Sequence, residues 1–83
     1  MERLDGNAAA GTLQEVFARE MTTAMETCAN CGRASAVGAV HVYMAGPGMV
    51  LRCPTCEAVL ICIVHAHEHL HVDLSGLRRI ELR

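Results

Sequence analysis

Two cysteine motifs decide the fold of this chain: Cys28-Ala29-Asn30-Cys31-Gly32 and Cys53-Pro54-Thr55-Cys56. Two residues separate the cysteines within each motif, and residues 32–52 lie between the motifs. Four thiolates in this pattern can surround one zinc ion at the corners of a tetrahedron, with Zn–S distances near ~2.3 Å. The sequence therefore predicts one metal site, formed by Cys28, Cys31, Cys53 and Cys56.

The segment between the motifs has the length and pattern of an out-and-back strand pair. Residues 37–44 alternate, with Val40, Val42 and Met44 on one side and His41 and Tyr43 on the other. Gly46-Pro47-Gly48 predicts the turn, and residues 49–52 return the chain to the second motif. Further strands are expected over residues 58–64, 69–74 and 77–82, the last two with Leu74, Ile80 and Leu82 inward.

One helix is expected before the first motif, over about residues 7–21, with an apolar stripe that includes Leu13 and Met21. Its start is open between a cap at Asp5 or Asn7 and a capping box that begins at Thr12. We therefore predict a single domain, 1–83, with this helix and a ribbon over about 25–83. The fold class is a small metal-bound β-rich (α+β) fold, a zinc ribbon β-meander with one N-terminal helix.

The segment 58–64 is apolar on both faces, as in a strand that is covered on both sides. The N-terminal helix can cover one side only. A chain of 83 residues has little else to cover the other, so a protein partner or a second copy is expected there.

Composition restricts the classes of function. An odd number of cysteines, five, and the CxxC spacing indicate metal binding rather than a secreted disulfide framework. No signal peptide is evident at the start, and the longest apolar run is far shorter than the ~20 residues of a membrane span. We therefore expect a cytoplasmic protein with reduced thiols and no membrane partner.

Two observations argue against a nucleic-acid-binding ribbon. The net charge is −2, and the basic residues are seven scattered arginines. One Tyr and one Phe offer almost no surface for base stacking. If such binding occurs, it should depend on salt and on Arg33, Arg52, Arg78 and Arg79.

A closed shell of four thiolates has no open position for substrate or water, so the expected metal is a structural zinc ion. The alternative is an iron centre of the rubredoxin kind, because iron also accepts tetrahedral sulfur. Gly32 after the first motif and Pro54 inside the second are compatible with a zinc site and with an iron site. Rubredoxins surround iron with aromatic side chains, and this chain offers only Phe17 and Tyr43. No catalytic constellation and no phosphate-binding loop is evident, so the chain is not expected to be an enzyme.

The fifth cysteine and the histidines are secondary candidates. Cys62 lies in the most apolar segment and is expected to be a core residue. His65, His67, His69 and His71 occupy every second position. A turn at 66–68 would still let His65 meet His69 or His71 across a hairpin, as a second zinc or nickel site with Glu68 or Asp73. These histidines are nevertheless expected to form a solvated hairpin tip, and His41 is also expected to be solvated.

The chain resembles a family of small actinobacterial zinc-ribbon proteins to which no activity is assigned. The resemblance rests on the opening Leu4-Asp5-Gly6-Asn7, the two cysteine motifs, Val42-Tyr43, Gly46-Pro47-Gly48, and the close Asp73-Leu74-Ser75-Gly76-Leu77. It implies a zinc ribbon that accompanies redox enzymes as an accessory subunit. The chain departs from the family pattern at its histidine-rich hairpin, where mixed Arg and Pro would be expected. Together these features predict a non-catalytic module that docks to another protein.

Overall fold

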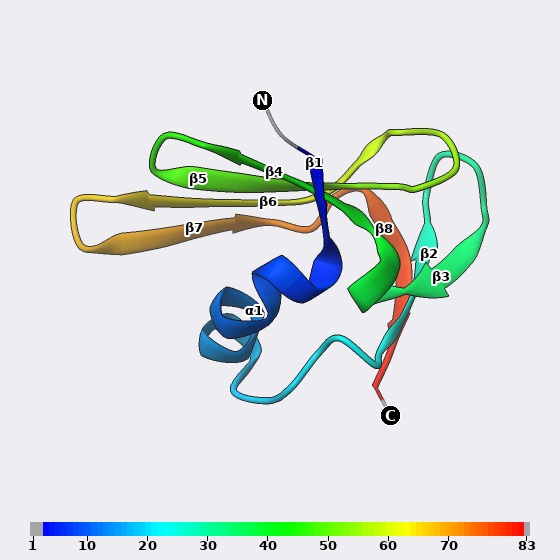
Figure 1. Ribbon diagram of the computed structural model, residues 1–83, viewed down its shortest axis with the longest axis horizontal. Helices are drawn as coiled ribbons and strands as arrows, with labels where there is room; N and C mark the ends of the chain where they lie inside the picture. The colour runs from blue at the N-terminus through cyan, green and yellow to red at the C-terminus, as the bar shows by residue number, and fades with distance from the viewer. Residues whose placement is uncertain (1–2, 83) are drawn as a thin grey trace.

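The computed structural model describes residues 3–82 of the chain. Two short 3₁₀ segments, one α-helix and two antiparallel sheets form the described part (Figure 1). The predicted fold class, a small β-rich protein with one helix, is confirmed. The elements in order are β1 (Arg3–Asp5), η1 (Gly6–Ala9), α1 (Ala10–Phe17), β2 (Met25–Cys28), β3 (Ala34–Ala36), η2 (Val37–Ala39), β4 (His41–Ala45), β5 (Gly48–Arg52), β6 (Val59–Ala66), β7 (His69–Asp73) and β8 (Leu77–Glu81).

The larger sheet has the strand order β1-β4-β5-β6-β7. From β4 to β7 it is the predicted meander, in which each strand pairs with the next along the chain. β1 adds an edge strand that the sequence did not predict, with Leu4 opposite Val42. Val42, Leu51 and Ile63 point to the same side of the sheet and are buried there.

The smaller sheet has the order β3-β2-β8 and holds the first cysteine motif at the end of β2. β8 leaves the meander and pairs with β2, so the prediction of one continuous meander was wrong at this strand. Its two outer strands, β3 and β8, run beside β2 in Figure 1. Ile80 is half-buried, whereas Leu74 and Leu82 are 39% and 52% exposed, contrary to the inward orientation predicted for both.

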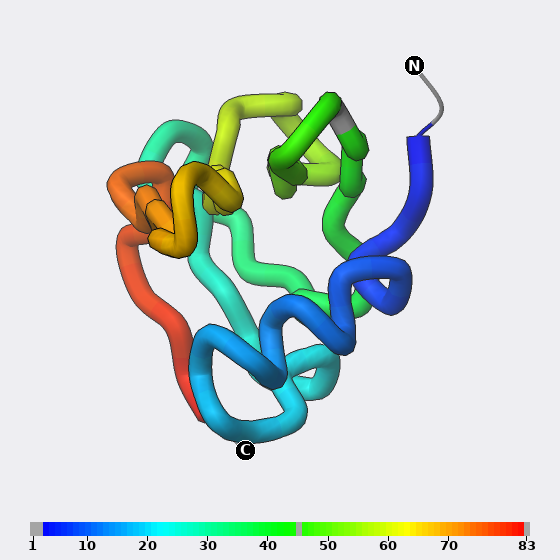
Figure 2. The backbone as a smooth tube through the Cα atoms, turned by 90° about the vertical axis from the view of Figure 1, so that its left-hand side faces the viewer, coloured from blue at the N-terminus to red at the C-terminus, as the bar shows by residue number. Residues whose placement is uncertain are grey.

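α1 covers one face of the larger sheet, as the views down two axes show (Figures 1 and 2). Leu13 is fully buried, and Val16 and Phe17 pack against the core from the same helix. The core therefore lies between this helix and one face of the sheet.

The helix is shorter than the predicted range 7–21. Asp5 caps the preceding 3₁₀ turn by accepting a hydrogen bond from the Asn7 N–H at 3.0 Å, and α1 begins only at Ala10. Ala18 adopts a left-handed conformation (φ 58°) and ends the helix. Met21 is buried as predicted, but it lies in the loop after the helix, where it still packs into the core. No helix in the described residues is both long enough and apolar enough to cross a membrane.

Candidate metal centre

The two cysteine motifs form turns with the same hydrogen bonds. In the first, the Gly32 N–H donates to the Cys28 carbonyl at 2.9 Å, and in the second the Glu57 N–H donates to the Cys53 carbonyl at 2.9 Å. Gly32 and Glu57, the residues that follow the two motifs, both have positive φ (78° and 65°). Glycine adopts this conformation without strain, whereas the equivalent role of Glu57 was missed because glutamate rarely adopts it.

The four thiols of the motifs converge. The Cys28 and Cys56 sulfurs are 3.7 Å apart, the Cys31 and Cys53 sulfurs are also 3.7 Å apart, and all four lie within 4.8 Å of one another. Sulfurs around a tetrahedral ion at ~2.3 Å are separated by about 3.8 Å. A disulfide would need about 2.05 Å, and all five cysteines are free. The four side chains therefore fit a metal ion that accepts four tetrahedral sulfur ligands.

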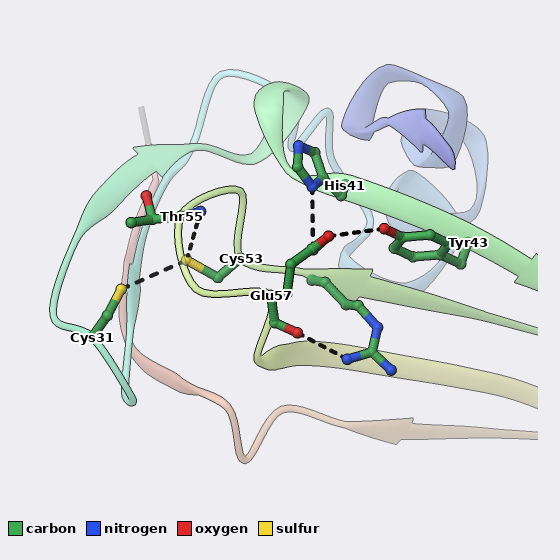
Figure 3. Close-up of polar contacts among 7 residues, drawn as sticks. Cys31, His41, Tyr43, Cys53, Thr55 and Glu57 are labelled. Atoms are coloured by element: carbon green, nitrogen blue, oxygen red, sulfur yellow. Dashed lines mark hydrogen bonds and ion pairs between the residues drawn. The ribbon is translucent and has the colours of Figure 1, made fainter. Parts of the chain in front are cut away.

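The site is anchored in the core on one side and open to solvent on the other. Cys28 and Cys53 are buried, Cys56 is half-buried and Cys31 is exposed. Figure 3 shows Cys53 between two partners, the Cys31 sulfur and the Thr55 N–H, which donates to the Cys53 sulfur at 3.4 Å. The Thr55 N–H bond helps to orient the Cys53 sulfur as a ligand.

Hydrogen bonds favour ionisation at one thiol and oppose it at another. The Asn30 amide donates to the Cys56 sulfur at 3.4 Å and is the main cause that lowers the pKa of Cys56 to about 6. At Cys31 the Arg33 backbone N–H favours the thiolate, but desolvation and hydrogen bonds with the three other thiols raise its pKa to about 11. Because neighbouring thiolates repel one another, all four ionise together only when a cation lies between them.

A cluster of polar side chains supports the second motif, and the sequence did not indicate it. The Glu57 carboxylate accepts a hydrogen bond from the Tyr43 hydroxyl at 2.9 Å and lies 3.2 Å from His41 Nδ1 (Figure 3). The Arg52 guanidinium donates to the Glu57 carbonyl at 2.8 Å and lies over the Tyr43 ring. The Tyr43 hydrogen bond is the largest cause that lowers the pKa of Glu57. His41 is therefore paired and only 21% exposed, rather than freely solvated as predicted.

A buried carboxyl group near the first motif was also missed. Glu26 in β2 is 1% exposed, and it accepts a hydrogen bond from the Ser35 hydroxyl of β3 at 2.5 Å. Burial raises the pKa of Glu26. The contact ties β3 to the strand that carries Cys28.

The remaining candidates lie outside the metal centre. Cys62 is half-buried in the middle of β6, away from the four-thiol cluster. The predicted turn after Ala66 is confirmed at His67 and Glu68, which places His65 and the later histidines on adjacent strands. The described residues contain one group of three or more converging ligand side chains, and it is the four cysteines.

The Glu57 position offers a test of the support around the second motif. We expect the melting temperature of Glu57→Ala to be several degrees below that of Glu57→Gly. Both variants lose the carboxylate contacts, but only glycine adopts positive φ without an energetic cost. Thermal unfolding of the two metal-loaded variants measures the difference. Equal melting temperatures would contradict the left-handed conformation at this residue.

Fold and site together define a small β-rich protein with one helix and a four-cysteine site that could bind a metal ion. The chain belongs to the family described as "Family of unknown function (DUF6510)", whose model matches residues 1–83. No curated protein and no solved structure shows a significant match to the chain.

Proposed function

We propose that the four thiolates hold a structural zinc ion and that the protein is a non-catalytic module that docks to another protein, as an accessory subunit. A shell of four cysteines leaves no coordination position for a substrate. The thiols must be reduced to bind the ion, which favours the cytoplasm as the compartment. The docking surface is the observation that carries this proposal.

That surface is the face of the larger sheet opposite α1. Val50, Cys62 and Val64 lie near its centre, on the middle strands β5 and β6, and are only half-buried. Side chains in the middle of a five-stranded sheet would be fully buried if a second layer covered them. Tyr43 of β4 and His71 of β7 border this apolar strip on the same face. An exposed apolar strip with a polar rim typically marks a contact with another protein.

Substitution at the centre of this face tests the docking function. We expect Val64→Arg to abolish binding to the protein captured by the native chain from its host, or to dissociate a homo-oligomer. Gln14→Arg adds the same charge on the exposed side of α1 and should leave both unchanged. Pull-down with mass spectrometry measures the binding of a partner, and analytical ultracentrifugation measures the oligomeric state. Two results together would contradict the proposal: the native protein is a monomer, and every protein that it captures is captured equally by Val64→Arg.

An electron carrier with iron in the same site is the second candidate. The N–H groups of Thr55 and Asn30 that donate to cysteine sulfurs favour it, because such bonds set the potential of iron–thiolate centres. Exposure of Cys31 would give an electron-transfer partner access to the metal. A colourless protein with one zinc ion per chain would reject this candidate.

Nucleic-acid binding has less support. Of the four arginines that it would require, Arg52 binds the Glu57 carbonyl and Arg79 lies 3.5 Å from Glu81. These contacts weaken the case for a basic binding face.

A further inference from the structure

The hairpin between β6 and β7 separates the alternating histidines in a specific way. His67 and Glu68 form its two-residue turn, and both have positive φ (47° and 68°). The register of the strands then places His65 opposite Leu70, Val64 opposite His71 and Ala66 opposite His69. Since residues directly opposite in an antiparallel pair share a face, His65 lies on one face and both later histidines lie on the other.

His65 belongs to the face that α1 covers. It lines a shallow cavity together with Thr12 of α1 and Ile63. His65 therefore does not meet His69 or His71 across the hairpin, so the cross-strand pair that the sequence allowed does not form.

His69 and His71 are neighbours on the opposite, uncovered face of β7. Both are exposed, and their ring centroids are 6.4 Å apart in an edge-to-face arrangement. Within residues 3–82, neither imidazole makes a hydrogen bond or an ion pair. Asp73 lies on the same face, but its carboxylate accepts a hydrogen bond from the Ser75 N–H at 2.8 Å. The two rings are thus available to an external ligand.

We propose that His69 and His71 form a second metal site, a two-imidazole chelate for a divalent transition-metal ion. Alternate residues of a strand lie about 6.6–6.8 Å apart along the chain, close to the 6.4 Å between the two ring centroids here. An ion bound at about 2.0–2.1 Å by each ring nitrogen needs the two nitrogens about 3 Å apart. Rotation of two exposed side chains about χ1 and χ2 supplies this approach without a change in the strand.

The site differs in kind from the four-cysteine centre. Imidazole nitrogens suit Zn²⁺, Ni²⁺ and Cu²⁺, whereas four thiolates select softer or tetrahedral sulfur-binding ions. Two protein ligands also leave coordination positions for water or for a donor atom of another molecule. An ion at the hairpin therefore keeps open coordination positions, whereas the shell of four cysteines has none.

Titration of the zinc-loaded protein with Ni²⁺ tests the proposal. Isothermal titration calorimetry should show one Ni²⁺ site per chain, and the ring protons of His69 and His71 should change in the NMR spectrum. Loss of one of two linked ligands should weaken the affinity by about 100-fold. We expect this loss in His69→Asn and in His71→Asn.

His65→Asn and His67→Asn are the matched controls, because they remove imidazoles from the same hairpin but not from this face. Both should bind Ni²⁺ with native affinity, and all four variants should keep their zinc and their melting temperature. Equal weakening in His65→Asn, or Ni²⁺ binding that persists in the His69→Asn/His71→Asn double variant, would overturn the proposal. Absence of Ni²⁺ binding to the native protein would do the same.

Discussion

Replacement of Cys53 by serine is expected to unfold the protein. Cys53 is 1% exposed, and its sulfur lies 3.7 Å from that of Cys31. The three remaining thiolates cannot close the tetrahedral shell, so the metal is lost. Structural zinc sites contribute about 10–16 kcal/mol, whereas a domain is stable by only about 5–15 kcal/mol in total. Circular dichroism and elemental analysis of Cys53→Ser should show a disordered chain without metal.

Cys62→Ser is the control for this prediction. The substitution is the same, but Cys62 lies outside the four-thiol cluster and is half-buried. We expect a folded protein with one metal ion, destabilised by about 1 kcal/mol. A Cys53→Ser protein that keeps its metal and its normal melting temperature would show that the site is not structural.

Replacement of Gly76 by alanine is expected to have the second largest effect. Gly76 joins the two sheets between β7 and β8, and its carbonyl accepts a hydrogen bond from the Ala29 N–H of the first cysteine motif at 2.9 Å. A Cβ atom at this position would lie 1.8 Å from the Val59 carbonyl oxygen and 2.8 Å from Leu60 Cα. Because both are backbone atoms, the start of β6 would have to move.

The expected cost of Gly76→Ala exceeds about 4 kcal/mol, in the range of the most disruptive single substitutions. Denaturant unfolding of the metal-loaded protein measures it. Gly11→Ala is the control, because among residues 3–82 no atom other than those of its chain neighbours and its own helix backbone lies within 4 Å of its Cβ position, and the residue is inside α1. That substitution should stabilise the protein by up to about 1 kcal/mol. Similar stability of the two variants would contradict the close approach at Gly76.

The cysteine site could be predicted from sequence because the spacing of the cysteines determines how their sulfurs are brought together. A CxxC motif needs only a local turn to bring its two sulfurs together, and the strands between the motifs return the second turn beside the first. The four converging thiols follow directly. The structure also explains two motifs of the family resemblance, the opening residues 4–7 and the closing residues 73–77. Asp5 caps the first turn, and Asp73 and Gly76 form the passage between the sheets.

The features that escaped prediction depend on contacts between distant segments. β8 pairs with β2 instead of continuing the meander, and its two apolar residues, Leu77 and Ile80, are too few to specify the neighbouring strand. Glu57 meets His41 and Tyr43 through the register of β4 and β5, and its positive φ departs from the preference of glutamate. Such long-range pairings leave no local pattern in the sequence.

The structural metal centre is the central claim, and X-ray absorption at the metal edge of the purified protein tests it most directly. A chain with one zinc ion should show four sulfur neighbours at about 2.3 Å and no nitrogen or oxygen in the first shell. In the His69→Asn/His71→Asn variant, which lacks the proposed second site, a mixed shell with nitrogen or oxygen would contradict the claim, and so would a folded protein without metal.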